Sequence, residues 1–169
     1  MTQERYSRQI LFKDIGEHGQ QTINQKHVLI VGMGALGTHV AEGLVRAGIR
    51  ELTIVDRDYI EYSNLQRQTL FTESDADRML PKVIAAQDHL KQIRSDIKIN
   101  IYIEHVDAQF LEQYATIVDL IIDATDNFET RQLINDFSYR YCIPWIYGGV
   151  VQSTYVAVSY THLTLPTKA

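Results

Sequence analysis

The sequence predicts an α/β fold in which an open, mostly parallel sheet carries helices on both faces. Short β-branched apolar runs, typical of buried strands, alternate along the chain with segments whose apolar residues recur at helical spacing. This alternation is typical of strands joined by crossover helices, and such strands pair in parallel. With 169 residues, the chain is long enough for one packed core and too short for two sizeable domains.

Each expected element follows from a local pattern. Residues 4–24, which precede the first strand, predict one or two short helices. The remaining patterns place strands at 27–32, 51–56, 97–103, 117–123, 144–148 and 151–158, and helices at 35–48, 82–94 and 127–141. Gly48 is expected to cap the end of a helix, and Pro81 to lie in a first helical turn. The strict alternation in 97–103 predicts a half-exposed strand.

The end of the sequence has a different character. The stretch 159–169 (SYTHLTLPTKA) has no helical pattern and stops without completing a strand–helix unit. We therefore expect residues 1–158 to form one domain that is incomplete at its C-terminus. Residues 159–169 are expected to be a non-native or disordered tail.

Composition and charge narrow the class of protein. Sixteen basic and twenty-one acidic residues give a net charge of −5, which argues against a nucleic-acid partner, because such partners require a basic surface. The single cysteine, Cys142, excludes an internal disulfide framework and is expected to be a packed core thiol. Without a membrane-length apolar run or a signal-peptide core, the chain is expected to be cytoplasmic, with no membrane partner.

The segment 32–37 (GMGALG) has the spacing G-x-G-x-x-G between an expected strand and an expected helix. Gly32, Gly34 and Gly37 permit a tight turn and a close approach of backbone to phosphate, and the helix N-terminus offers free N–H groups to an anion. Asp56, at the end of the second strand, can accept hydrogen bonds from a ribose diol. These features predict a Rossmann-like nucleotide-binding domain rather than a merely structural turn, and alone they favour a dinucleotide such as NAD.

Polar residues beyond the ribose carboxylate favour a nucleoside triphosphate instead. Residues 61–68 read EYSNLQRQ, and further along the chain Lys82 follows Pro81. Arg67 can clamp phosphate oxygens with its planar fork, and Lys82 can supply a point charge. Asn64 and Gln66 can orient the phosphate chain. A solvated surface charge is the alternative interpretation of both basic residues.

The segment 123–127 (DATDN) ends a strand at the edge where parallel sheets bind ligands. Asp126 is a candidate Mg²⁺ ligand, because Mg²⁺ prefers one or two carboxylates together with phosphate oxygens. It is equally a candidate helix N-cap, with Glu129 reaching back as the partner in a capping box. The two roles do not exclude each other.

These motifs together resemble the ThiF/MoeB/HesA group, the bacterial relatives of ubiquitin-activating enzymes. The resemblance covers about residues 4–158, and its motifs are RYSRQI at 5–10, VLIVGMGALG at 28–37, VDRD around Asp56, SNLQRQ at 63–68, PK at 81–82 and DATDN at 123–127. It implies an ATP- and Mg²⁺-dependent adenylyltransferase. The implied partner is a small ubiquitin-like sulfur carrier of thiamine or molybdopterin biosynthesis, activated at the carboxylate of its C-terminal Gly-Gly.

The resemblance also implies roles for individual residues. The expected nucleotide-binding residues are Gly32, Gly34, Ala35, Gly37, Asp56, Ser63, Asn64, Leu65, Gln66, Arg67, Lys82, Asp126 and Asn127. The expected catalytic residues are Arg8, Arg67, Lys82 and Asp126, of which Asp126 holds Mg²⁺. Arg8 is expected to reach the γ-phosphate region of a neighbouring subunit, which requires a homodimer.

The chain departs from this group in one respect. Members usually carry two Cys-x-x-Cys half-sites for zinc beyond the strand at 151–158, and these cysteines are absent here. Two other functions therefore stay open, a non-catalytic nucleotide-binding or dimerisation module and an NAD-dependent oxidoreductase. The identity of the carrier and of its pathway also stays open.

Overall fold

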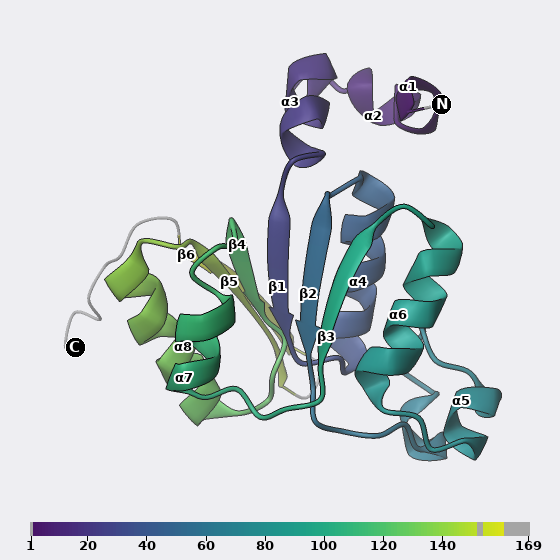
Figure 1. Ribbon diagram of the computed structural model, residues 1–169, viewed down its shortest axis with the longest axis vertical. Coiled ribbons are helices and arrows are strands. Elements are labelled where there is room, and N and C mark those ends of the chain that lie inside the picture. Colours follow the sequence, from purple (N-terminus) through teal and green to yellow (C-terminus); the bar gives the residue numbers. More distant parts are fainter. Residues whose placement is uncertain (1, 152–153, 161–169) are drawn as a thin grey trace.

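The computed structural model describes residues 2–151 and 154–160, which form a six-stranded sheet with helices on both faces (Figure 1). The strands are β1 (His27–Val31), β2 (Glu51–Val55), β3 (Lys98–Tyr102), β4 (Leu120–Asp123), β5 (Trp145–Val151) and β6 (Thr154–Tyr160). Their order in the sheet is β3-β2-β1-β4-β5-β6. All neighbours are parallel except β5 and β6. The predicted α/β fold is confirmed.

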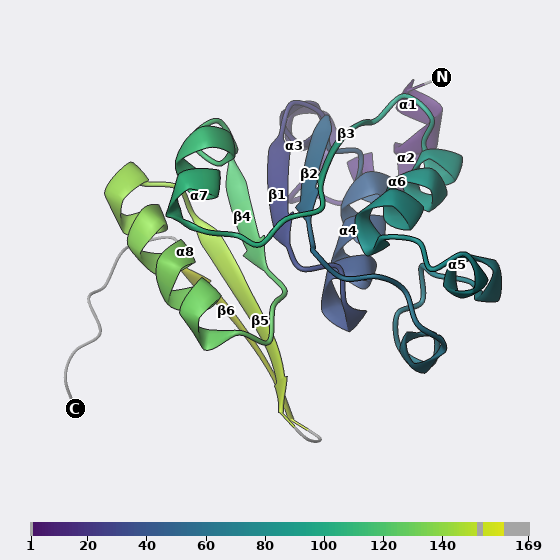
Figure 2. The same cartoon turned by 60° about the horizontal axis from the view of Figure 1, so that its bottom comes forward.

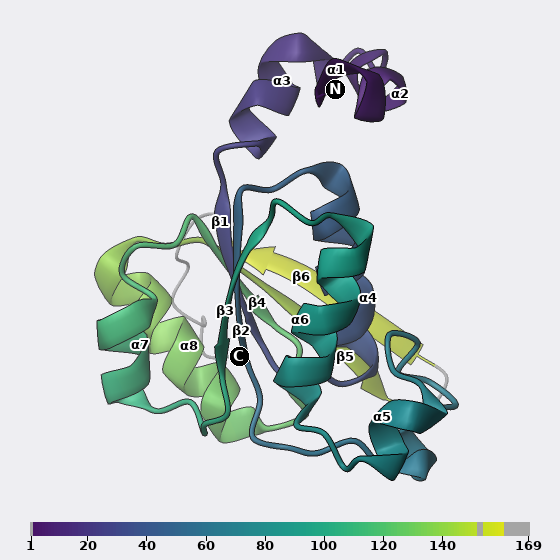
Figure 3. The same cartoon turned by 45° about the vertical axis from the view of Figure 1, so that its right-hand side comes forward.

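The helices divide between the two faces of the sheet. They are α1 (Thr2–Arg5), α2 (Ser7–Ile10), α3 (Gly16–Ile23), α4 (Ala35–Ala47), α5 (Glu73–Asp77), α6 (Lys82–Ile93), α7 (Ala108–Tyr114) and α8 (Phe128–Tyr141), with a 3₁₀ turn, η1, at Tyr62–Asn64. Figures 2 and 3 show α4 and α6 on one face and α7 and α8 on the other. None of the helices in the described part of the chain is long and apolar enough to cross a membrane.

Both faces of the sheet are buried, which explains the continuous apolar runs. In β1, Val28 and Ile30 pack into the core under α4 and α6, whereas Leu29 and Val31 pack into the core under α7 and α8. Successive side chains of a strand point to opposite faces, so a central strand covered on both sides needs an apolar residue at every position. The edge strand β3 is only partly buried, as its alternating sequence predicts.

The observed elements lie within a few residues of the predicted ones. The N-terminal segment forms three short helices rather than one or two, and β6 continues to Tyr160. The rest of the expected tail, residues 161–169, lies outside the described residues. Three short elements, η1, α5 and α7, had no prediction. Each has two turns or fewer, which is too short for apolar periodicity to mark it.

Two local expectations were wrong. Pro81 precedes α6 as its N-cap residue and does not lie in the first turn. Cys142 is exposed and is not a core thiol. It forms the C-cap of α8 in the left-handed conformation, with φ of 54°, at the point where the chain leaves the helix for β5. Its place in this turn, rather than its apolar character, determines its exposure.

Candidate functional site

Three loops that carry predicted site residues meet at the carboxyl edge of the sheet. They follow β1, β2 and β4, which are neighbours in the sheet. The chain proceeds from β1 to β2 and β3 on one side and places β4 on the other side, so the strand order reverses beside β1. In open α/β sheets, ligands bind at this reversal, beyond the carboxyl ends of the strands. Figure 1 shows this edge at the lower end of the sheet.

The glycine loop connects β1 to α4, as the sequence predicts. Gly32 has φ of 95°, and a Cβ atom there would lie 3.0 Å from the carbonyl oxygen of Ala124. A Cβ atom at Gly37 would overlap the carbonyl oxygen of Gly32, so only glycine fits. Gly34 is the N-cap residue of α4, and no side chain caps the helix. The loop therefore leaves the first N–H groups of α4 without a side-chain partner, an arrangement that suits an anion.

Asp56 fastens the glycine loop to the end of β2. One carboxylate oxygen accepts a hydrogen bond of 2.6 Å from the backbone N–H of Met33. The other accepts one of 2.8 Å from the backbone N–H of Asp58. The carboxylate is half-buried beside the loop. Since each oxygen has a second lone pair, the group can still accept hydrogen bonds from a ligand's hydroxyls.

Lys82 lies at the start of α6 with its side chain only 8% exposed. Its ammonium group is 2.9 Å from a carboxylate oxygen of Asp58, and its backbone N–H donates to the Asp58 carbonyl oxygen. This burial contradicts the interpretation of Lys82 as a solvated surface charge. Asp58 is a residue that the prediction missed, although the second acid of VDRD marked it.

The segment with the SNLQRQ motif begins in η1. Asn64 accepts a hydrogen bond of 3.0 Å from the backbone N–H of Glu61 through its side-chain oxygen. Arg67 is exposed, and its guanidinium donates to the carbonyl oxygen of Ser63 at 2.9 Å. Exposure of Arg67 agrees with both interpretations, the phosphate clamp and the solvated charge.

The other side chains of this motif differ in burial. Leu65 packs against the core under α4 and α6. Gln66 is exposed, whereas Gln68 is 3% exposed. The side-chain oxygen of Gln68 has no hydrogen-bond partner among the described residues. Sequence reasoning selected Gln66 and missed Gln68, since nothing local distinguishes the two amides.

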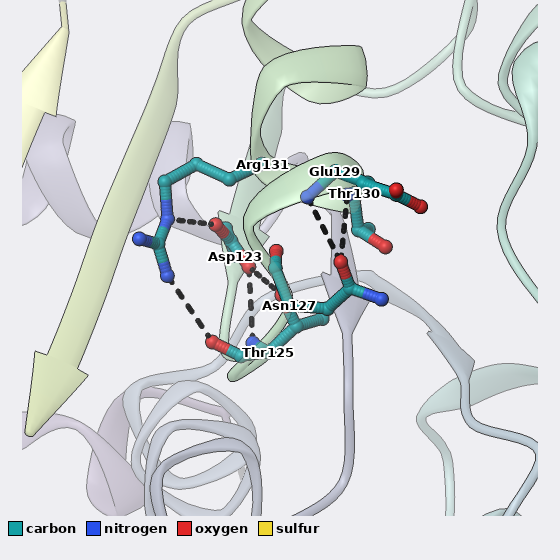
Figure 4. A network of polar contacts seen from close by, with 6 residues as sticks. All are labelled: Asp123, Thr125, Asn127, Glu129, Thr130 and Arg131. Carbon is teal, nitrogen blue, oxygen red and sulfur yellow. Dashed lines mark hydrogen bonds and ion pairs between the residues drawn. The ribbon is translucent and has the colours of Figure 1, made fainter.

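The turn after β4 is held by a network of polar contacts (Figure 4). Asp123 is fully buried and accepts hydrogen bonds from the backbone N–H and the hydroxyl of Thr125, at 3.0 and 2.7 Å. Arg131 donates to the other carboxylate oxygen of Asp123 at 3.2 Å. The Arg131 guanidinium also lies 3.7 Å from the centroid of the Tyr147 ring. The prediction identified neither Asp123 nor Arg131.

Asn127, not Asp126, caps α8. The side-chain oxygen of Asn127 accepts hydrogen bonds from the backbone N–H groups of Glu129 and Thr130, at 2.8 and 3.4 Å. The alternative in which Asp126 and Glu129 form a capping box is therefore wrong, because the helix starts one residue later than that motif requires. Asp126 is exposed, and it makes no hydrogen bond or ion pair within the described part of the chain.

Arg8 lies far from these loops within one chain. It is exposed on α2, and α1, α2 and α3 precede the N-terminal end of β1. Figures 1 and 3 show these helices at the end of the molecule opposite the glycine loop. The structure therefore does not bring Arg8 together with Arg67, Lys82 or Asp126.

The described residues fit a nucleotide-bound metal better than a metal cage. No three His, Cys, Asp or Glu side chains in residues 2–151 and 154–160 group in a way that could hold a metal ion. Mg²⁺ bound with a nucleotide needs only one or two protein carboxylates, because the phosphates and water complete its shell. Asp126 offers one such free carboxylate. The chain has one cysteine, so it does not contain the Cys-x-x-Cys pairs that the resemblance implies for a zinc site.

An open parallel sheet with a glycine loop at its strand reversal defines a Rossmann-like nucleotide-binding domain. The chain belongs to the ThiF family, which it matches over residues 6–164. It is 46% identical to the sulfur carrier protein ThiS adenylyltransferase of Bacillus subtilis, over 88% of this chain and 44% of that protein. It is 35% identical to the molybdopterin-synthase adenylyltransferase of Haemophilus influenzae, over 88% of this chain and 60% of that protein.

The structural comparison agrees with this family. The crystal structure of Escherichia coli MccB with AMPCPP and MccA superposes with a TM-score of 0.82 at 29% identity, over 92% of this chain and 48% of that chain. The chain thus spans about half the length of the relatives named above, from 44% to 60% of each curated protein.

Proposed function

We propose that this chain provides the nucleotide-binding unit of an adenylyltransferase that activates the C-terminal carboxylate of a small ubiquitin-like sulfur carrier. The observation that carries this proposal is the convergence of the glycine loop, Asp56, Lys82 and the 123–127 turn at one edge of the sheet. Membership of the ThiF family and relatives named adenylyltransferases support the same activity. Residues 1–158 would form this unit as one domain.

ATP is the proposed nucleotide. The uncapped N-terminus of α4 and the ammonium group of Lys82 offer positive potential to phosphates, and the exposed Arg67 offers a further cation. Asp56 would accept hydrogen bonds from the ribose hydroxyls. The free carboxylate of Asp126 would hold Mg²⁺, which would neutralise phosphate charge when bound. The similar structure of MccB, which was determined with the ATP analogue AMPCPP, supports this choice.

The reaction would need no activated side-chain nucleophile. A carboxylate oxygen of the carrier attacks the α-phosphorus of ATP, the bond from the α-phosphorus to the bridging oxygen breaks, and pyrophosphate leaves. The product is a mixed anhydride of the carrier and AMP. The main barrier is electrostatic, because an anion approaches a polyanion and negative charge grows on the leaving group. Lys82 and Arg67 would stabilise that charge.

A ThiS-type carrier is the proposed partner. The relatives named ThiS adenylyltransferases from Bacillus subtilis and Escherichia coli share 46% and 44% identity with this chain. The molybdopterin-synthase adenylyltransferase shares 35%. We further propose a homodimer in which Arg8 of each subunit reaches the site of the other, since Arg8 cannot reach the loops of its own chain.

ATP–pyrophosphate exchange tests this function. It should be measured on this chain, and on a version extended to the length of its relatives, with a ThiS-type carrier and with the carrier of a molybdopterin-synthase adenylyltransferase. We expect exchange that depends on the carrier and is faster with ThiS. Calorimetry should show Mg·ATP binding more tightly than NAD.

Two results would contradict the proposal. NAD binding as tight as ATP binding would favour an oxidoreductase, which hydride transfer followed by NADH absorbance would then reveal. ATP binding without carrier-dependent exchange, even in the extended version, would leave a non-catalytic nucleotide-binding or dimerisation module.

A further inference from the structure

Arg131 joins three elements that meet at the candidate site. It lies in the first turn of α8, and its Nε atom donates to the buried carboxylate of Asp123 at the end of β4. Its Nη2 atom is 3.5 Å from the carbonyl oxygen of Thr125, in the turn that follows. Its guanidinium carbon lies over the ring of Tyr147 in β5, 3.7 Å from the ring centroid. One side chain therefore connects β4, the 123–127 turn and β5.

The path of the turn depends on these contacts. Asp123 is fully buried, and a buried carboxylate is stable only when it is paired and hydrogen-bonded. Thr125 satisfies one of its oxygens and Arg131 the other. The backbone N–H of Ala124 donates to the carbonyl oxygen of Val31, which ties the same turn to the start of the glycine loop. The turn is thus fastened on both sides.

Asp126 has no such contacts of its own. Within the described residues it forms no hydrogen bond or ion pair, although it follows Thr125 directly. The place of its carboxylate is therefore set by the backbone of the turn, and Arg131 contacts that backbone one residue before it.

We propose that Arg131 is a positioning residue that holds the 123–127 turn so that Asp126 can bind the Mg²⁺ of a bound nucleotide. This inference rests on the proposed function, which assigns Mg²⁺ to Asp126. Lysine cannot replace arginine in this role. Its single ammonium group lacks the planar fork that reaches Asp123 and Thr125 together and stacks on Tyr147.

The variant Arg131→Lys separates the positioning role from charge pairing, because lysine keeps a positive charge beside Asp123. ATP affinity is measured by calorimetry in excess Mg²⁺ and in EDTA. We expect the Mg²⁺-dependent affinity to fall about 10-fold or more, with only an about two-fold change in EDTA, as for residues that support a metal ligand. The double variant Arg131→Lys/Asp126→Asn should bind Mg·ATP no more weakly than Asp126→Asn alone, because both act on one contact.

Two further variants keep the test decisive. Arg140→Lys is the matched control, since Arg140 lies on the same helix, is 70% exposed and pairs with Glu112. It should leave both affinities unchanged. If Arg131→Lys does not fold, as urea denaturation would show, Tyr147→Leu removes the ring under the guanidinium and leaves the Asp123 pair. It should weaken binding in Mg²⁺ more than in EDTA.

Three outcomes would overturn the inference. Unchanged Mg²⁺ dependence in Asp126→Asn removes the metal role of Asp126, and with it this part of the proposed function. If Asp126→Asn is impaired but folded Arg131→Lys keeps a normal Mg²⁺ dependence, the role of Arg131 is refuted and that of Asp126 stands. Where Arg131→Lys does not fold, a normal Mg²⁺ dependence in Tyr147→Leu has the same meaning. Equal loss of affinity in Mg²⁺ and in EDTA shows that Arg131 only supports the fold.

Discussion

Gly37 shows how one atom decides whether the glycine loop can form. A Cβ atom at this position would overlap the carbonyl oxygen of Gly32, whereas a Cβ atom at Gly43, further along α4, would meet nothing within 4 Å. Two glycines of the same helix therefore have different reasons for being there. Gly37 allows helix and loop to approach closely, and Gly43 only lowers helix propensity.

Replacement of these two glycines by alanine should have opposite effects. Gly37→Ala forces backbone atoms apart and should lower the free energy of unfolding by about 1–3 kcal/mol. It should also weaken ATP binding, because the loop must move. Gly43→Ala, the control, should raise the free energy of unfolding by about 0.4–1 kcal/mol. Urea denaturation and calorimetry measure both, and a Gly37→Ala protein as stable as the parent would contradict the observed packing.

At the scale of the element, the start of α8 gives different roles to two neighbouring residues, Asp126 and Asn127, that are hard to distinguish in the sequence. Asn127 satisfies the first free N–H groups of the helix, and Asp126 stays free for a ligand. The cap at Asn127 determines where the helix begins and leaves Asp126, the residue just before it, at the carboxyl edge of the sheet. Because Asn127 caps the helix, the carboxylate of Asp126 can serve a ligand.

The stability of α8 should respond to the cap and not to its neighbour. Asn127→Ala should lower the free energy of unfolding by about 1 kcal/mol, and Asn127→Asp should be nearly neutral, because asparagine and aspartate cap about equally well. Asp126→Ala should leave stability unchanged, since its carboxylate has no partner in the described structure. Thermal and urea unfolding provide the comparison. Destabilisation by Asp126→Ala equal to that by Asn127→Ala would restore the rejected cap.

At the scale of the whole molecule, a polar cluster lies on the sheet away from the nucleotide edge. His27, Glu51 and Thr53 in this cluster are buried, and Asn100 is partly buried. The His27 ring is 2.8 Å from the Thr53 hydroxyl and 3.8 Å from the Glu51 carboxylate. Burial lowers the pKa of His27, and the opposing effect of Glu51 only reduces that shift. The native state therefore favours the neutral ring, and the unfolded chain binds a proton more readily.

Mild acid should consequently destabilise the protein through His27. Because the folded pKa lies below the unfolded value of about 6.5, the unfolded state binds more protons between the two, and stability falls as the pH falls through that window. The slope is at most about 1.4 kcal/mol per pH unit. Urea denaturation between pH 7.5 and 5.5 should show a smaller loss in His27→Gln than in the parent. His18→Gln, on the exposed surface of α3, is the control, and an unchanged slope in His27→Gln would contradict the prediction.

Arg8 lies far from the site of its own chain, so the proposed homodimer predicts that two inactive variants can complement each other. Arg8→Ala should lower pyrophosphate exchange by on the order of 10³-fold, with only a few-fold change in ATP affinity, because such an arginine acts mainly on the transition state. Mixing it with an inactive Arg67→Ala variant should restore about a quarter of the sites in random dimers. The measurement uses the extended version under subunit exchange. If two folded, dimeric variants regain no activity when mixed, Arg8 does not act across the interface.

The local sequence was sufficient for the fold and for the backbone of the site. Buried strands, the helical stripes and the G-x-G-x-x-G loop are patterns within a few consecutive residues, and the sheet follows from their alternation because parallel strands need crossover helices. Asp56 was predictable for the same reason, since its place at a strand end is a local property. Short elements such as α5 and α7 escaped prediction because two turns contain too few apolar positions.

Contacts between distant residues required the tertiary structure. The pairs Lys82–Asp58 and Arg131–Asp123 join separate elements, and no spacing within one element encodes them. The same holds for the exposure of Cys142, which depends on how the chain leaves α8. The sequence contains each of these side chains, but the energy of burying a charge depends on which partner the packed fold places beside it.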